Sequence, residues 1–222
     1  MFCVGLLMLV SASPACENGV DVNSRQSSNS NLYLVGESLT NPGGEWPEQL
    51  NALLGSGYVF YNVAIGGTGT DQMLARFDTD VVNATPSPDW VTILSGTHDV
   101  SRPNEYTLAG TEYNLQQMYN KAHAAGIKVI AITIPPCDFQ AAVAEQQNFK
   151  LALDDWIMHT AANVDYRIDI YPLLDDGAGG LSCNNTVCYY NIGSDHQHLS
   201  YAGGTVVANA IYAGVDWSGV AL

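Results

Sequence analysis

The stretch NLYLVGESLT, residues 31–40, decides the fold of this chain. Residues 32–35 form a short apolar run, which is typical of a β-strand buried on both faces. The run leads directly into Gly36-Glu37-Ser38, so a serine hydroxyl follows the carboxyl end of the predicted strand. In an open parallel sheet, ligands bind at that edge. Ser38 is therefore a candidate catalytic residue, although an isolated serine at such a place is more often a turn residue or a helix N-cap.

Four further apolar runs predict strands at residues 58–61, 90–94, 127–134 and 164–170. The stretches between them carry apolar residues at helical spacing. The residues expected on buried helix faces are Trp46, Leu50, Leu53 and Leu54, then Leu74, Phe77 and Val81, then Leu115, Met118, Tyr119 and Ala122, and finally Phe149, Leu153, Trp156 and Ile157. This alternation predicts an α/β fold, a three-layer α/β/α domain around a mainly parallel five-stranded sheet. We expect four of the strands to be buried on both faces.

A second chemical motif, Asp195-His196-Gln197-His198-Leu199, precedes an apolar, glycine-rich helical stretch at residues 200–213. An aspartate three residues before a histidine can accept the imidazole Nδ1–H and leave Nε2 free to act as a base. Asp195 and His198 are therefore candidates for the orienting group and the base of a serine triad that includes Ser38.

Two more glycine-containing loops, residues 62–67 and 95–99, follow the second and third predicted strands. In a parallel sheet they lie at the same edge as Ser38, and their glycine N–H groups can bind a developing negative charge. A serine, exposed N–H groups and a D-x-x-H pair at one edge form a coherent site for acyl transfer.

At these places the chain resembles the SGNH/GDSL hydrolases, over residues 31–215. Residues 36–40 are similar to the family's nucleophile block, with Glu37 where aspartate is usual. Residues 62–67 and 96–99 are similar to the second and third blocks, and Asp195 with His198 matches the terminal D-x-x-H.

The resemblance implies the flavodoxin-like SGNH fold and a serine esterase that needs no cofactor and no metal. Its substrates would be small acyl esters, such as short-chain or carbohydrate acetyl esters or lysophospholipids. Ser38, His198 and Asp195 would form the triad, and the oxyanion hole would combine the N–H groups of Ser38 and Gly67 with the side chain of His98. His98 stands where the family has asparagine; a neutral imidazole donates one N–H, with a different reach from an amide.

Two other functions stay open at this point. His98, Asp195, His196 and His198 could ligate a metal ion, although neither H-E-x-x-H nor C-x-x-C spacing occurs in the chain. The alternative is a catalytically impaired SGNH-fold protein that binds carbohydrate and has lost its chemistry at His98.

Composition excludes one class of partner. The chain has 22 acidic and 7 basic residues and a formal charge of −15, and its basic residues are scattered, so it will not bind a nucleic-acid backbone. Its 222 residues suit one domain. The sequence does not indicate an oligomeric state.

The N-terminal residues 1–15, MFCVGLLMLVSASPA, resemble a signal peptide without its basic start, and residues 16–30 have the composition of a flexible polar linker. The catalytic domain is expected at residues 31–222. We expect a secreted or cell-surface/periplasmic protein, and Cys16 could instead carry a lipid anchor. Cys183 and Cys188 could form a disulfide or remain buried thiols.

Overall fold

The computed structural model describes residues 29–41, 45–177, 179, 183–184, 187–188 and 197–219. The signal-like segment, Cys16, Asp195 and His196 lie outside these residues. Among the residues that are described, no helix is both long and apolar enough to cross a membrane.

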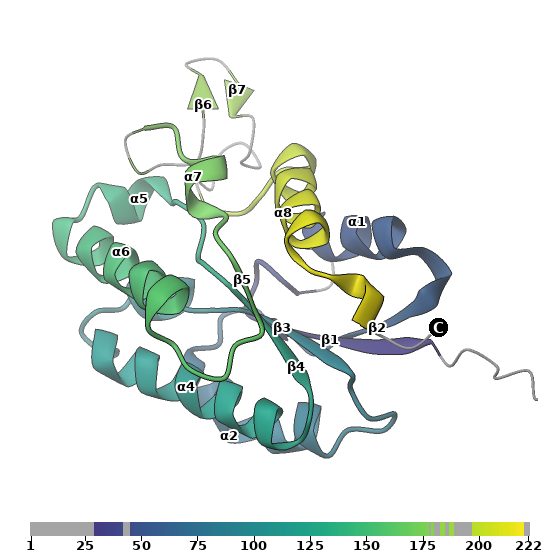
Figure 1. Cartoon of the computed structure of the whole chain (residues 1–222). Helices are drawn as coiled ribbons and strands as arrows, with labels where there is room; N and C mark the ends of the chain where they lie inside the picture. The colour runs from purple at the N-terminus through teal and green to yellow at the C-terminus, as the bar shows by residue number, and fades with distance from the viewer. Residues whose placement is uncertain are drawn as a thin grey trace, which may run out of the picture.

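A five-stranded sheet forms the centre of the molecule (Figure 1). Its strands are β1 (Ser30–Gly36), β2 (Tyr58–Asn62), β3 (Trp90–Leu94), β4 (Lys128–Ile132) and β5 (Tyr166–Ile168), in the spatial order β2-β1-β3-β4-β5. All neighbouring strands in it run parallel, which confirms the predicted sheet. Gly36 pairs with Leu94 and Leu34 with Asn62, so the carboxyl ends of the three strands lie along one edge.

Helices cover both faces of this sheet (Figure 1). On one face lie α1 (Glu45–Leu54), α8 (Tyr201–Gly214) and the short α7 (Tyr171–Leu174), and on the other lie α2 (Thr70–Phe77), α4 (Leu108–Ala124) and α6 (Ala144–His159). Two short helices, α3 (Thr97–Val100) and α5 (Asp138–Ala141), follow β3 and β4. Short 3₁₀ helices occupy Gly55–Gly57 and Trp217–Gly219, and a π-helical segment, Asp78–Val82, directly follows α2.

Each face of the sheet has its own hydrophobic core, because successive strand residues point to opposite sides. Leu32 and Leu34 of β1 belong to the core under α1 and α8, and Tyr33 and Val35 belong to the core under α2, α4 and α6. Burying one large apolar side chain of this kind contributes about 1.5–3 kcal/mol. The two cores together hold the sheet edge that carries the candidate site.

The burial of the strands and of α1 differs in part from the prediction. β1, β3 and β4 are almost fully buried, whereas β2 is half-buried throughout and β5 at two of its three residues. Three strands rather than four are therefore buried on both faces, since β2 and β5 are edge strands with one neighbour each. Leu53, predicted on the buried face of α1, is 41% exposed.

A small hairpin brings the backbone of Cys183 opposite that of Cys188. β6 (Cys183–Asn184) and β7 (Val187–Cys188) pair antiparallel, with Cys183 opposite Cys188. Cα atoms of directly opposed antiparallel residues are about 4.5–5.5 Å apart, which suits a disulfide. The bridge stays a prediction.

Candidate active site

Ser38 lies on a tight turn that begins where β1 ends. The N–H groups of Thr40 and Asn41 donate to the Glu37 carbonyl oxygen, at 3.0 and 2.9 Å. A Cβ atom at Gly36 would lie 2.5 Å from Thr40 Oγ1 and 2.6 Å from the Leu94 carbonyl oxygen, so only glycine lets this turn pack against β3. The turn leaves Ser38 half-buried.

The loop after β2 lies beside Ser38. A Cβ atom at Gly66 would be only 3.7 Å from the Ser38 Cβ atom. The Asn62 side chain joins the two loops, since its amide donates to the Thr40 carbonyl and its Oδ1 accepts from the Ala64 N–H at 3.0 Å. Gly67 is exposed and has a φ of 74°, a conformation that favours glycine.

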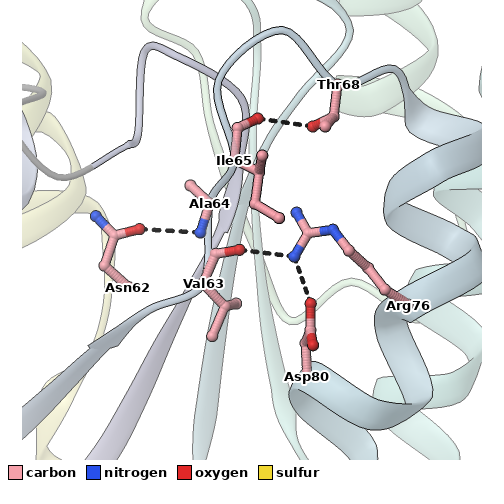
Figure 2. Close-up of polar contacts among 7 residues, drawn as sticks. All are labelled: Asn62, Val63, Ala64, Ile65, Thr68, Arg76 and Asp80. Carbon is pink, nitrogen blue, oxygen red and sulfur yellow. Dashed lines mark hydrogen bonds and ion pairs between the residues drawn. The ribbon is translucent and has the colours of Figure 1, made fainter.

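Figure 2 shows how this second loop is held from α2. The Arg76 guanidinium donates to the Val63 carbonyl at 2.7 Å and also pairs with Asp80. The Thr68 hydroxyl closes the loop by donating to the Ile65 carbonyl at 2.7 Å. The backbone on either side of Gly67 is thus held by Arg76 of α2 and by Thr68 within the loop.

The loop after β3 is tied to the serine turn by Glu37, which is 1% exposed. Its Oε1 accepts from the Thr97 N–H at 2.9 Å, and its Oε2 accepts from Ser95 Oγ at 3.2 Å and from the Gly96 N–H at 3.4 Å. Burial raises the pKa of Glu37 to about 7; nearby Asp99 adds to the rise and the three hydrogen bonds oppose it. Glu37 is therefore a functional candidate, whereas from the sequence it was only a departure from the family pattern.

Asp99 fixes the same loop from the other side. Its buried carboxylate accepts from the Thr70 N–H at 3.0 Å, from the Thr70 hydroxyl at 2.5 Å and from the Thr111 hydroxyl at 2.7 Å. Burial raises the pKa of Asp99, although these hydrogen bonds lower it. Asp99 therefore joins α3 to the first turns of α2 and α4 and is a structural group.

His98, which lies between Thr97 and Asp99 in this loop, has an unused hydrogen-bonding capacity. Both of its ring nitrogens are buried, and neither has a hydrogen-bond partner within the described chain. Burial lowers the pKa of His98, and Arg102 lowers it further, while nearby Asp99 opposes the shift; the net change favours the neutral ring. A buried polar group without a partner costs about 1–3 kcal/mol.

The two backbone donors named from the sequence are unused as well. Neither the Ser38 N–H nor the Gly67 N–H makes a hydrogen bond to any residue that the structure describes. Ser38, Gly67 and His98 thus lie on three loops that the contacts through Asn62 and Glu37 hold together.

His198 lies in the bend before α8 and is half-buried. The next residue, Leu199, is buried in the same core as Leu39, which follows Ser38. The first turn of α8 packs on the start of α1, since a Cβ atom at Gly204 would be 2.3 Å from the Glu45 Cβ atom. Asp195 lies outside the described residues, so the geometry of the triad stays a prediction.

The metal alternative is also untested. The described residues contain no group of three or more side chains suited to hold a metal ion. The hypothesis depends on Asp195 and His196, however, and both lie outside them.

The GDSL-like Lipase/Acylhydrolase family model matches residues 29–203, a span that includes the first three of these loops and His198. The chain belongs to this family. It is accordingly a hydrolase that acts on ester bonds. The resemblance predicted from the four motifs is confirmed.

Solved structures of GDSL-type enzymes share the fold. A putative acylhydrolase from Bacteroides fragilis is 24% identical with a TM-score of 0.64, covering 85% of this chain and 89% of that one. A GDSL-like lipase from Bacteroides thetaiotaomicron is 22% identical with a TM-score of 0.63, covering 82% and 86%. A variant of Axe2, an acetylxylan esterase from Geobacillus stearothermophilus, is 18% identical with a TM-score of 0.67, covering 86% and 98%. No curated protein matched the chain.

Proposed function

We propose that this GDSL-family hydrolase is a serine esterase for small acyl esters, with acetylated carbohydrates as its main substrate class. The observation that carries the proposal is the meeting of three loops around Ser38, in which the N–H groups of Ser38 and Gly67 and the ring of His98 have no hydrogen-bond partner among the described residues. These are the donors that an oxyanion would need.

In the proposed mechanism, His198 takes the proton of the Ser38 hydroxyl while Oγ attacks the ester carbonyl carbon. Asp195 orients His198 and stabilises the imidazolium. The tetrahedral oxyanion accepts hydrogen bonds from the Ser38 and Gly67 N–H groups and from His98. Collapse of this intermediate leaves an acyl group on Ser38 and releases the alcohol, which takes the proton from His198. Water, deprotonated by His198, then hydrolyses the acyl-enzyme.

The similar structures support both parts of the proposal. Axe2 is described as an acetylxylan esterase, and its catalytic mutants replace a serine, an aspartate and a histidine by alanine. In Axe2 that aspartate and histidine lie three residues apart, the spacing of Asp195 and His198 in this chain.

The first test is hydrolysis of p-nitrophenyl acetate by the wild type and by Ser38→Ala. We expect the variant to lose at least about 10³ in kcat, because the nucleophile is gone. Ser56→Ala, which changes an exposed serine in the turn after α1, is the matched control and should retain full activity. Turnover by Ser38→Ala at the wild-type rate would refute the assignment.

Two further outcomes separate the alternatives. Activity that disappears in chelator and returns with a divalent cation would favour the metal-dependent hydrolase. Carbohydrate binding by a folded wild type that hydrolyses no ester would favour the impaired carbohydrate-binding protein.

We also propose that the protein is secreted or displayed at the cell surface, because residues 1–15 have the apolar run and small-residue end of a signal peptide. Mass spectrometry of the mature N-terminus tests this. Cleavage before Cys16 with a lipid on its thiol would indicate an anchor, and an uncleaved chain would refute export by this route.

A further inference from the structure

Helices α1 and α8 lie side by side over one face of the sheet (Figure 1). A groove lined by residues of both helices lies between them. It encloses about 380 Å³, within the usual size range of sites for small ligands. Glu45 and Tyr201 line it at the first residues of the two helices, and Leu53 and Asn209 line it further along them. From Glu45 to Leu53 the helix rises by about 12 Å, enough to lie along a short oligosaccharide.

The walls of the groove offer polar groups that the protein itself does not use. Glu45, Glu48 and Asn209 make no side-chain hydrogen bond or ion pair with the described residues. The floor is different, because the Thr205 hydroxyl donates to Gln49 Oε1 at 2.5 Å and the Gln49 amide donates to the Tyr201 carbonyl at 3.0 Å. A rigid floor below free carboxylates and a free amide suits a ligand rich in hydroxyl groups.

An exposed aromatic ring stands at one end of this groove. The side chain of Tyr201 is 69% exposed, although burial of an aromatic ring is normally favourable. Its ring face can stack on the C–H face of a sugar, and Leu53, 41% exposed, adds apolar surface at the other end. Aromatic and apolar surface together with free hydrogen-bonding groups is a combination that binds carbohydrate.

The groove begins at the edge of the sheet that carries Ser38. Tyr201 is three residues after His198, and Glu45 starts the helix that follows the serine turn. The two helix starts are packed together at Gly204. The Glu45–Tyr201 end of the groove is therefore the end formed by the helices that follow the serine turn and His198.

We propose that this groove binds a neutral oligosaccharide that carries the ester, on the alcohol side of the bond to be cleaved. This inference rests on the proposed function and selects among its substrate classes. Glu45 and Glu48, in a protein of net charge −15, disfavour uronic-acid chains and phospholipid headgroups.

The kinetic test compares kcat/KM for an acetylated xylo-oligosaccharide with kcat/KM for p-nitrophenyl acetate, measured on each variant. In Tyr201→Ala, we expect the ratio of the two to fall about tenfold, mainly through a higher KM for the oligosaccharide. Tyr113→Ala removes another exposed tyrosine, 62% exposed on α4 over the opposite face of the sheet, and should leave the ratio unchanged. Equal ratios in Tyr201→Ala, Tyr113→Ala and the wild type would overturn the proposal.

A binding test needs no catalysis and separates this inference from the proposed function. Titration of the wild type with unacetylated xylo-oligosaccharide, followed by NMR, should shift signals of Tyr201 and Asn209. Binding there by a protein that hydrolyses no ester would support the groove and refute the esterase. Ester hydrolysis with no shift in the groove would refute the groove alone.

The negative charge of the groove is tested with an acidic substrate. An acetylated oligouronide should be a poorer substrate than the neutral oligosaccharide, and Glu48→Gln should improve its kcat/KM about fivefold, because a like charge is removed. No preference for the neutral chain would contradict this part of the proposal.

Discussion

Replacing Glu37 by glutamine changes one atom of a buried group that joins the serine turn to the loop of His98. The substitution keeps the size of the side chain and removes its charge. In the folded protein the pKa of Glu37 is raised from its ordinary 4.5 to about 7, with burial as the main cause. Between these two values the folded state binds a proton that the unfolded state has released, so the free energy of unfolding falls as pH rises.

The size of the stability change follows from the difference between the two pKa values of Glu37, about 7 and 4.5. Between pH 5 and pH 8, the titration of Glu37 should lower the free energy of unfolding of the wild type by about 2–3 kcal/mol relative to Glu37→Gln. The stabilising contribution of the proton on Glu37 is largest at low pH, where the folded wild type keeps that proton, and it is lost by about pH 8. Below pH 4.5 the carboxyl is protonated in both states and the difference no longer changes.

The assay is urea unfolding of the wild type and Glu37→Gln, followed by circular dichroism at pH 5 and pH 8. Glu145→Gln makes the same substitution at an exposed residue of α6 and should differ from the wild type by less than about 0.5 kcal/mol at both pH values. A difference between wild type and Glu37→Gln that is the same at both pH values would refute this account of Glu37. A wild type that gains stability relative to Glu37→Gln as the pH rises would show instead that the carboxylate is stabilised as a charge.

Two further predictions concern the backbone and the oxyanion donors. Gly36→Ala should lower the free energy of unfolding by about 1–3 kcal/mol, because the added Cβ would lie 2.5 Å from Thr40 Oγ1 and 2.6 Å from the Leu94 carbonyl oxygen. Gly57→Ala is the control in urea unfolding, since a Cβ atom there has no other atom within 4 Å. Equal stability of the two variants would contradict the packing argument. His98→Ala should lower kcat for p-nitrophenyl acetate by about 10²–10³ with little change in KM, and steady-state kinetics that show an unchanged kcat would remove His98 from the oxyanion hole.

The sheet and its loops could be predicted from the sequence because their signals are local. An apolar run that ends in Gly36-Glu37-Ser38 marks a buried strand and the loop after it without reference to the rest of the chain. The same holds for residues 90–94, which form β3 with the predicted bounds. The burial of the edge strands β2 and β5 was harder to predict, because it depends on how many neighbouring strands each has.

The groove could not be predicted, because it depends on two helices that are far apart in the sequence. Periodicity places Leu53 on the apolar side of α1, yet its exposure is set by where α8 packs. Gly204 lets the start of α8 approach Glu45 closely, and no local pattern indicates this contact. A helix stripe predicts which side faces inward, and only the packed neighbours decide how far burial extends.

The two departures from the family pattern, Glu37 and His98, look unrelated in the sequence because sixty residues separate them. In the structure they are neighbours, since Glu37 Oε1 accepts a hydrogen bond from the N–H of Thr97, the residue before His98. A glutamate carboxylate lies one methylene further from its backbone than an aspartate carboxylate, so it holds the Thr97 loop from a different distance. An imidazole is larger than the amide it replaces and needs a differently placed backbone to direct an N–H to the same point. Matching the motifs one residue at a time treats these as two separate departures, whereas the hydrogen bonds from Gly96 and Thr97 make Glu37 part of what positions the backbone that carries His98.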